Sequence, residues 1–428
     1  MTRLGAWLRA PRLAPLQWGI ALAVVLVLAA SRAPYLLLHG RFWAEEGSIY
    51  FAHSARSGGA DALGFVYTNA RYYNLFPNVA TWLASGVSLE RAPLVTAWMS
   101  FGVVALIAWI ALAWPSDLLP NVGAKLAAAV LLVVGTLAEP EVWLNTLHVQ
   151  VYLAIAALLL LFVRVHDLGR PRFVAGLGIL VVAGLTGLYA AAFAPLFIVR
   201  ALLDRTRRRF AWALAVVVPA LVQVVVVLTR EDTKHVESVK ATNPGLEEAA
   251  RTILVWHLSA FAFGADLVRD LNKNARAGSG FTWVAIVLGA VVLVAFLVLL
   301  CRGLPNVQVP LLLAGALVII EILIQLGSFG EAGGRYAVLP IAILTLLVVH
   351  GAATARPGVL QFGALALCGL VLLVGLWQFW TRQSARLRCI DCPEWDQQVE
   401  RWRHDHDLPL VIWPYEGEVR GGWQIRLP

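Results

Sequence analysis

Long apolar runs recur along most of the chain and constrain its fold more than any other feature of the sequence. About eleven of them cross or nearly cross a lipid bilayer, which takes roughly 20 apolar residues in a helix. Their approximate bounds are 15–38, 93–113, 124–138, 151–164, 173–187, 189–203, 210–228, 281–300, 309–326, 336–350 and 359–380. Composition agrees, since 60% of the residues are hydrophobic and only 14% are charged. We therefore expect an all-α polytopic membrane protein, with one transmembrane module over 1–380 and a small C-terminal domain over 381–428.

Lysine and arginine are unevenly divided among the loops, which indicates the orientation of the chain. With a cytoplasmic N-terminus, the inward loops include the basic cluster DRTRRR at 204–209 and contain few acids. An odd number of spans then places the C-terminus outside. The outward segments, in which acids balance the basic residues, are 39–92, 139–150, 229–280, 327–335 and the tail from 381.

One weakly apolar stretch, 75–89, is interpreted as an external helix lying along the membrane surface. Counting it as a span would reverse every later loop and place the basic cluster outside. The net charge of +8 does not indicate a nucleic-acid partner, because inward loops account for much of it and no basic patch with interleaved aromatics appears. No Walker loop, dinucleotide-binding glycine pattern or HExxH motif is present.

Two adjacent carboxylates, Glu45 and Glu46, lie in the sequence WAEEG directly after the first apolar run. Acids in such a place can stabilise the N-terminus of a surface helix through its dipole. They can also act on a substrate, because a positioned carboxylate takes the proton of a weakly nucleophilic alcohol or amide. Transfer of a sugar from a lipid phosphate would need such a base and also a cation. Arg335, at the outer mouth of a span, offers a planar fork for that phosphate.

Other polar residues of the outward side have a structural and a functional interpretation. Arg32 either extends to the membrane surface or binds phosphate beside the acids. Glu321 and Gln325, four residues apart within a span, pair with a neighbouring helix or mark a polar site in the membrane. Three residues of the second outward loop are candidates for binding sugar hydroxyls: Asn145, His148 and Gln150. A cluster in the first loop forms a membrane belt or a sugar-stacking wall, and it includes Tyr72, Tyr73 and Asn74.

Three short motifs resemble those of the GT-C superfamily of polytopic glycosyltransferases, which use polyprenyl-phosphate sugar donors outside the cytoplasm. They are FWAEEG in the first outward loop, EPEVWLNTLHVQ in the second, and GGRYAVLP late in the chain. The resemblance covers roughly residues 15–350 and includes the arabinosyl, mannosyl and aminoarabinose transferases of bacterial envelopes. Many members have Asp where this chain has Glu, the second acidic site is represented only by Glu139 and Glu141, and the tail has no counterpart.

The resemblance implies an inverting transferase in the bacterial inner membrane, with its active site facing the periplasm. Glu46 would be the base, because it aligns better with the expected acid and Gly47 leaves room for substrate. Glu45 would orient the acceptor or Arg335, or bind a divalent ion. Arg335, Tyr336 and Arg32 would hold the donor phosphate. The implied partners are the lipid-linked donor and a glycan, lipid or protein acceptor, with no cofactor and with metal dependence open.

Two other functions fit the same topology. A transporter or flippase of lipid-linked sugars is favoured by Glu321 and Gln325, because such proteins place polar residues near the middle of the membrane. A ligase or polymerase that moves whole glycans from a diphosphate lipid is favoured by the large outward segment 229–280. In the tail, Cys389 and Cys392 form CIDC, which predicts a disulfide in an oxidising compartment. A metal clip completed by His404 and His406, or free thiols, are the alternatives.

Overall fold

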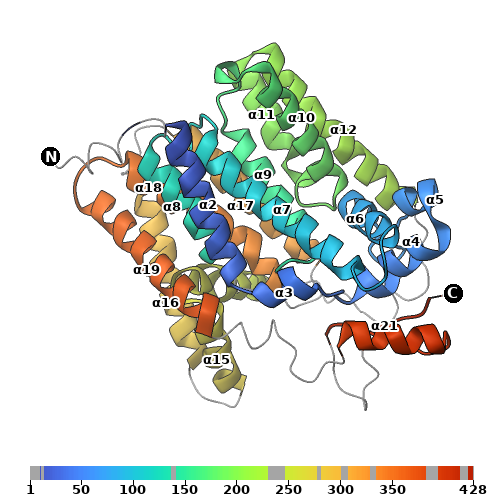
Figure 1. The fold of residues 1–428 in the computed structure, drawn as a ribbon. Coiled ribbons are helices and arrows are strands. Elements are labelled where there is room, and N and C mark those ends of the chain that lie inside the picture. The colour runs from blue at the N-terminus through green and yellow to red at the C-terminus, as the bar shows by residue number, and fades with distance from the viewer. Residues whose placement is uncertain are drawn as a thin grey trace.

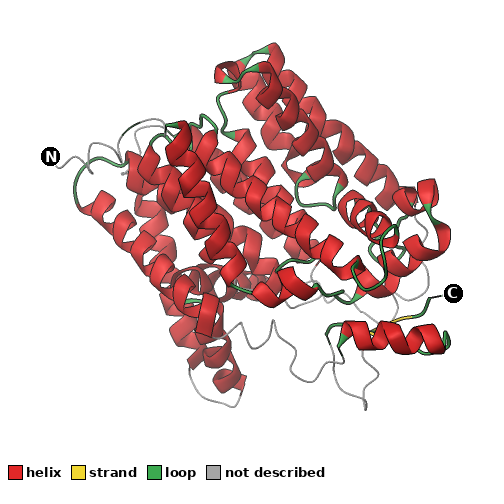
Figure 2. Ribbon diagram, in the orientation of Figure 1, coloured by secondary structure: helices red, strands yellow, loops and turns green. Residues whose placement is uncertain are grey.

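The computed structural model of the 428-residue chain describes residues 10, 14–135, 141–229, 246–276, 281–299, 307–327, 334–381, 394–414 and 423–427. Most of these residues are helical, and most of the helices pack side by side in one bundle (Figures 1 and 2). Within the described part, one small antiparallel sheet pairs β1 (Leu410–Val411) with β2 (Gln424–Ile425). The expectation of a nearly all-α protein is confirmed.

The long helices of the bundle alternate with shorter helical segments. The bundle helices are α2 (Pro15–Ser31), α7 (Ala92–Ala113), α8 (Val122–Val134), α9 (Val149–Leu161), α10 (Arg170–Leu185), α11 (Ala194–Asp204), α12 (Arg207–Thr229), α16 (Phe281–Val298), α17 (Gln308–Gly327), α18 (Val338–Thr354) and α19 (Val359–Thr381). The shorter segments are α3 (Pro34–His39), η1 (Glu46–Phe51), α4 (Ala52–Ser57), α5 (Gly59–Gly64), α6 (Leu75–Ser85), η2 (Val165–Asp167), η3 (Ala191–Phe193), α13 (Leu246–Arg251), η5 (Thr252–Ser259), α14 (Ala260–Phe263), α15 (Ala265–Arg276), η7 (Gly334–Ala337) and α21 (Trp395–His404). Both η1 and η5 are π-helices.

Five of the described helical segments are long and apolar enough to cross a membrane. They are Ala92–Ala113, Arg207–Thr229, Gln308–Gln325, Gly334–Thr354 and Val359–Trp380. Other apolar helices are shorter: α8 and α9 have 13 residues each. Such a helix is about 20 Å long, less than the ~30 Å of a bilayer core. These helices support a multi-pass membrane protein, while the count of eleven spans and the orientation remain predictions.

Two segments differ from what the apolar pattern predicts. The first run, 15–38, is not one helix, because α2 ends at Ser31 and α3 begins at Pro34, whose ring removes a backbone donor. The segment 229–280, expected as an external loop, contains an apolar helix over Ala249–Phe263. His257 interrupts this apolar run and weakens its pattern in the sequence.

Two helices form the centre of the bundle. Every residue of α9 is buried, and α18 is buried from Val338 to Gly351. The two helices pack against each other, as expected for helices that are apolar on all sides. Outer helices instead expose large apolar side chains, including Leu228, Trp283 and Phe362. An exposed surface of this kind suits contact with lipid.

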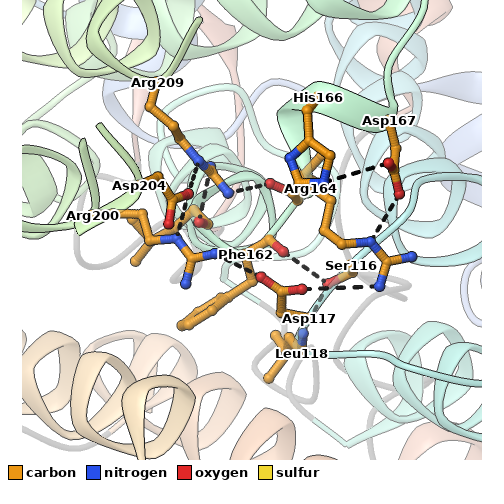
Figure 3. A network of polar contacts seen from close by, with 12 residues as sticks. Ser116, Asp117, Leu118, Phe162, Arg164, His166, Asp167, Arg200, Asp204 and Arg209 are labelled. Carbon is orange, nitrogen blue, oxygen red and sulfur yellow. Dashed lines mark hydrogen bonds and ion pairs between the residues drawn. The ribbon is translucent and has the colours of Figure 1, made fainter. Parts of the chain in front are cut away.

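One end of the bundle carries a network of ion pairs between α11, α12 and the preceding turns (Figure 3). Arg200 donates to Asp117 at 2.6 Å and to Asp204 at 3.1 Å. Arg209 donates to the same oxygen of Asp204 at 2.7 Å. At the adjoining turn, Arg164 donates to Asp167 at 2.9 Å. Asp117 therefore lies beside Arg200 at this end of the bundle, although the two residues come from separate parts of the sequence.

Basic side chains at this end also bind the last carbonyl groups of two helices. Arg209 donates to the carbonyl oxygen of Leu161 at 3.2 Å and to that of Val163, where α9 ends. Lys125 Nζ donates to the carbonyl oxygen of Trp114 at 3.0 Å, just after α7. Helix C-termini carry partial negative charge, so cations stabilise them. Part of the basic cluster predicted from the inward loops thus has a structural role.

The C-terminal segment packs at the other end of the bundle, beneath α3 and α4 (Figure 1). Helix α21 and the β1–β2 pair share a second apolar core with the chain between α3 and α7. The buried members of this core are Phe42, Phe51, Ala52, Ala84, Ala92, Val399, Leu410, Ile412 and Ile425. The predicted disulfide of Cys389 with Cys392 lies outside the described residues.

Candidate functional site

The acidic pair lies where the turn after α3 leads into η1, which begins at Glu46. Gly40 has a φ of 70°, and a Cβ there would overlap the backbone of Pro93. Ala44 has a φ of 44°, a left-handed conformation that residues with a side chain seldom adopt. The chain reverses at these positions, and Glu45 and Glu46 then lie in different surroundings, the first half-buried and the second fully buried.

Glu46 anchors this turn to the second loop of the site. Its Oε1 accepts hydrogen bonds from the amide of Thr146 at 2.8 Å and from the hydroxyl of the same residue at 2.5 Å. Its Oε2 accepts from the amide of Trp43 at 3.1 Å. Burial raises the pKa of Glu46, while these donors and the nearby Arg41 lower it. Two residues, Thr146 and Trp43, thus supply three donor groups to Glu46, an arrangement that suits an ionised carboxylate.

Arg41 supplies the charge that balances Glu46. Its Nη2 donates to the carbonyl oxygen of Trp143 at 2.9 Å. Its guanidinium carbon lies 4.5 Å from the ring centroid of Trp43 and 5.0 Å from that of Trp413, which gives two cation–π contacts. Burial lowers the pKa of Arg41, and the charge of Glu46 raises it. Sequence reasoning missed Arg41 because two of its partners, Trp143 and Trp413, come from distant parts of the chain.

Glu45 is the carboxylate of the pair that is open to a ligand. It is half-buried at the start of η1, and its side chain has no hydrogen bond or ion pair with the residues that the structure describes. It lies within electrostatic range of Tyr50 and Tyr72. The pKa of each hydroxyl is raised, mainly by burial and additionally by the charge of Glu45.

Tyr72 lies near both the acidic turn and Arg335. Gln150, in the first turn of α9, donates to the Tyr72 hydroxyl at 3.1 Å. The side-chain amide of Gln150 packs against Gly187. This glycine has a φ of 75°, and a Cβ added to it would overlap Gln150 Oε1. Burial raises the pKa of Tyr72, and both Arg335 and Glu45 are close enough to influence it. Through Tyr72, the segment 39–92 therefore comes close to the motif GGRYAVLP that contains Arg335.

The two residues after Tyr72 hold the loop in place. The hydroxyl of Tyr73 donates to the carbonyl oxygen of Leu63 at 2.6 Å, and its amide donates to Gln223 Oε1 at 3.0 Å. Asn74 is buried and pairs with Thr186 in an isolated β-bridge. Of this predicted sugar-stacking group, Tyr72 is the member that lies near both Glu45 and Arg335.

Arg335 lies at the mouth of α18, in η7. Its Nη1 donates to Glu141 Oε1 at 2.6 Å, and its Nη2 lies 3.1 Å from the hydroxyl oxygen of Tyr336. The guanidinium also covers the Tyr336 ring, with 5.0 Å between its carbon and the ring centroid. The side chain is 41% exposed, so a ligand can reach it. The structure thus brings a cation to the same end of the bundle as Glu45.

His148 is buried beside this ion pair, at the start of α9. Its Nε2 is 3.8 Å from Glu141 Oε1, and its buried Nδ1 has no hydrogen-bond partner in the described part of the chain. Burial lowers the pKa of His148 to about 4, an effect that the charge of Glu141 opposes. The imidazole is therefore neutral at pH 7 and has a nitrogen free for a polar ligand.

Asn145 shapes the loop before His148. Its Nδ2 donates to the carbonyl oxygen of Glu141 at 3.2 Å, and its Oδ1 accepts from the amide of Leu147 at 2.9 Å. Both ends of the amide are thus engaged within the loop rather than turned towards a ligand. Thr146, which binds Glu46, was not singled out from the sequence because one threonine in a loop has no distinguishing pattern.

Arg32 is buried rather than extended to the membrane surface. Its guanidinium carbon lies 4.6 Å from the ring centroid of Trp143 and 5.2 Å from that of Phe379. A separate polar pair is buried between η5 and α17, where His257 Nδ1 lies 2.5 Å from Glu321 Oε1. Glu321 and Gln325 therefore lie with His257 in the bundle, apart from the acidic turn.

Several residues of the loops predicted to face outward thus form one candidate site, at the end of the bundle opposite the basic network. It contains Glu45, Tyr72, His148, Gln150, Arg335 and Tyr336. Among the described residues, no group of three His, Cys, Asp or Glu side chains is placed to hold a metal ion. Comparison of the chain with protein-family models, curated proteins and solved structures finds no match. The function is therefore inferred from the residues and their geometry.

Proposed function

We propose that this protein is an inverting glycosyltransferase of the GT-C type. It would move a monosaccharide from a polyprenyl-phosphate carrier to an envelope glycan, lipid or protein. The supporting observation is made at the start of α9. Gln150 donates to the hydroxyl of Tyr72, which lies near Glu45. His148, two residues earlier, lies beside the ion pair of Glu141 with Arg335. Such a transfer requires a carboxylate base and a phosphate-binding cation at the same end of the bundle.

Glu45 is the proposed general base. It removes the proton of an acceptor hydroxyl while the oxygen attacks the anomeric carbon of the sugar. The bond from that carbon to the phosphate oxygen breaks, and polyprenyl phosphate leaves with the electron pair. One displacement inverts the anomeric configuration. Motif resemblance favours Glu46 for this role, but three donors already engage that buried carboxylate, so the geometry favours Glu45.

Arg335 is the proposed phosphate ligand. Its guanidinium is partly exposed and offers two donors in one plane, which suits a phosphate. Glu141 already binds one of these nitrogens, so the phosphate must share Arg335 with this carboxylate or displace it. Tyr336 lies beside the guanidinium and can donate its hydroxyl proton to a phosphate oxygen. Arg32 is buried among aromatic rings and is assigned no direct contact.

The sugar would lie between these two charged groups. His148 and Gln150 start α9 on the same side as Tyr72 and Arg335. The unpartnered Nδ1 of His148 and the amide of Gln150 supply donors and acceptors for hydroxyl groups. The aromatic ring of Tyr72 supplies an apolar face. This arrangement supports the prediction of a sugar site for three of the residues selected from the sequence.

A narrow apolar crevice beside Arg335 suggests where the lipid chain approaches. Its lining includes Gly135 and Gly264, which follow α8 and α14, together with Gly334 of η7, Val338 of α18 and Gly375 of α19. Its volume is about 30 Å³, enough for one or two water molecules. A polyprenyl chain would therefore lie along the membrane side of these helices, with its phosphate at Arg335.

The membrane orientation follows from the two ends of the bundle. The basic network lies at one end and the proposed site at the other. Basic loops favour the cytoplasm, so the site would face the periplasm of a bacterial inner membrane. Cysteine labelling at Ser57 and at Arg205, in intact and permeabilised cells, tests this placement. Labelling of a cysteine at 205 in intact cells would reverse it.

The function is tested with the purified protein and a panel of polyprenyl-phosphate monosaccharides. Released polyprenyl phosphate is measured by mass spectrometry for wild type, Glu45→Gln and Glu46→Gln, with envelope extract as acceptor and with or without EDTA. Release from one donor, lowered about 10²–10⁴-fold by Glu45→Gln, is expected for loss of a general base. Full activity of Glu45→Gln would remove this residue from the role. Inhibition by EDTA would indicate a metal requirement.

The alternative of a lipid-linked sugar transporter is supported by the polar pair inside the bundle. His257 and Glu321 are buried, and Glu321 Oε2 and Gln325 Nε2 have no hydrogen-bond partner among the described residues. Such groups within a membrane often serve transport. Turnover of donor in detergent, where no gradient exists, would argue against transport. Diphosphate-linked glycans in the same panel test the ligase alternative.

A further inference from the structure

The backbone of the C-terminal segment binds directly to the acidic turn. The carbonyl oxygen of Trp413 accepts from the amide of Ala44 at 2.5 Å, and the amide of Trp413 donates to the carbonyl oxygen of Phe42 at 3.2 Å. These two bonds pair Trp413 with Trp43 in a parallel β-bridge. The residue immediately before Glu45 is therefore held by a residue from the other end of the chain.

Side chains of the same segment cover the back of the turn. A Cβ on Gly47 would lie 2.7 Å from Ile412 Cδ1 and 3.0 Å from Ile425 Cδ1, so the two isoleucines lie against the glycine backbone. Both isoleucines are buried. The indole of Trp413 also covers Arg41, the residue that balances the charge of Glu46. The C-terminal segment thus forms one wall of the acidic turn.

Further contacts fasten the segment along its length. Arg403 forms an ion pair with Glu90, just before α7. Trp395 Nε1 donates to the carbonyl oxygen of Leu89 at 2.9 Å. At the other end of the segment, Arg56 donates to the carbonyl oxygen of Arg426 at 2.7 Å. Contacts at both ends make the docked position part of the fold.

We infer that the C-terminal residues 394–414 and 423–427 hold the acidic turn in place, and that Trp413 is a positioning residue for Glu45. Ala44 keeps a left-handed backbone, which persists only where the surroundings enforce it. The Trp413 carbonyl and the packing on Gly47 provide that enforcement. Without them, residues 42–46 relax and the Glu45 carboxylate moves. The catalytic part of this inference rests on the proposed function, whereas the structural part does not.

The test replaces a buried isoleucine of the segment by an acid. Ile425→Asp places an unpaired carboxylate in the second core, which should release the segment from the turn. Gln424→Asp introduces the same charge at the neighbouring position, whose side chain points to the other face of the strand, and serves as the matched control. Ile425→Ala is a milder variant that adds no charge.

Two readouts separate the structural inference from the proposed activity. The first is hydrogen exchange of the peptide that contains the Ala44 amide, in the full-length protein in detergent. Its protection should fall roughly tenfold or more in Ile425→Asp and less in Ile425→Ala, while peptides from α9 and α18 stay protected. The second is donor release, in which kcat should fall about 10²-fold with a smaller change in KM, because a displaced base slows the chemical step.

The outcomes are distinct. If Ala44 stays protected in Ile425→Asp, the segment does not hold the turn and the inference is overturned. If Ala44 is released but kcat for donor release is unchanged, the segment docks without positioning Glu45, which also overturns it. If wild type releases no donor, the proposed function fails, and the exchange data alone decide whether the segment orders the acidic turn. If Gln424→Asp lowered the protection of Ala44 and kcat as much as Ile425→Asp does, the effect could not be assigned to the buried face of β2.

Discussion

Arg335 and Glu141 form an ion pair, with 2.6 Å between Nη1 and Oε1, at the mouth of the proposed site. Glu141 therefore neutralises the cation that is proposed to bind the donor phosphate. His148, whose Nε2 lies 3.8 Å from the same carboxylate oxygen, stays neutral and supplies no further positive charge. The affinity of the site for a phosphate should thus depend on how Arg335 is divided between Glu141 and the ligand.

Replacing Glu141 by Gln should tighten binding of a lipid phosphate. The change removes a negative charge that competes for Arg335, and a partly exposed pair of this kind is worth about 1 kcal/mol, or roughly a fivefold lower Kd. Binding of polyprenyl phosphate is measured by quenching of tryptophan fluorescence. Asp167→Asn, which removes the carboxylate paired with Arg164 at the opposite end of the bundle, should leave Kd unchanged. An unchanged Kd in Glu141→Gln would assign the phosphate elsewhere, and weaker binding would contradict the competition for Arg335.

Replacing Thr146 by Val should destabilise the site while changing its shape little. The variant removes the hydroxyl donor to the buried carboxylate of Glu46, and a hydrogen bond to a charged group contributes about 1.5–3 kcal/mol. The apparent melting temperature in detergent should fall. Thr146→Ser retains the hydroxyl and should melt close to wild type. Equal melting temperatures for the Val and Ser variants would show that the hydroxyl is not needed to hold Glu46.

Replacing Gly187 by Ala should displace Gln150 from Tyr72. The new Cβ overlaps the Gln150 amide, and a φ of 75° is unfavourable for alanine by about 1–2 kcal/mol. We expect weaker donor binding and a lower melting temperature. Gly178→Ala is the control, because no atom lies within 4 Å of its added Cβ and alanine favours helix. The prediction fails if Gly187→Ala binds donor as tightly as Gly178→Ala does.

Acidification should destabilise the protein through His148. Its pKa is lowered to about 4 in the folded state, from an ordinary value near 6.5. Between these values the unfolded histidine binds a proton that the folded one does not, so stability is lost as pH falls from 6.5 towards 4. The slope should approach about 1.4 kcal/mol per pH unit in this window. His148→Gln should reduce that slope, as measured by melting temperature across the pH range.

The apolar pattern predicts most of the bundle, because a long hydrophobic run has few other ways to fold. It also predicts the acidic turn and Arg335 on one side of the membrane, and the structure places both at one end of the bundle. The helix over Ala249–Phe263 does not stand out in the apolar pattern, because His257 and neighbouring polar residues interrupt the run. The break at Ser31 arises from a proline that the surrounding apolar residues conceal.

The difference between Glu45 and Glu46 could not be predicted from their adjacent positions. It depends on the left-handed backbone of Ala44 and on Thr146, 100 residues further along the chain. The proposed role of Trp413 could not be predicted from the sequence either, because it depends mainly on backbone groups that any residue carries. Local sequence reports neither a backbone angle nor a distant partner, so these two features could not be read from the sequence.

The bond from Arg209 to the carbonyl oxygen of Leu161 bears on how the chain is assembled during synthesis. Arg209 follows Leu161 by 48 residues, so α9 leaves the ribosome well before the side chain that caps its end. Until α12 arrives, these carbonyl groups must be satisfied by water or lipid headgroups at the membrane surface. The central helix of the bundle therefore reaches its final environment late, and an insertion intermediate that lacks α12 should be the form most exposed to membrane quality-control proteases.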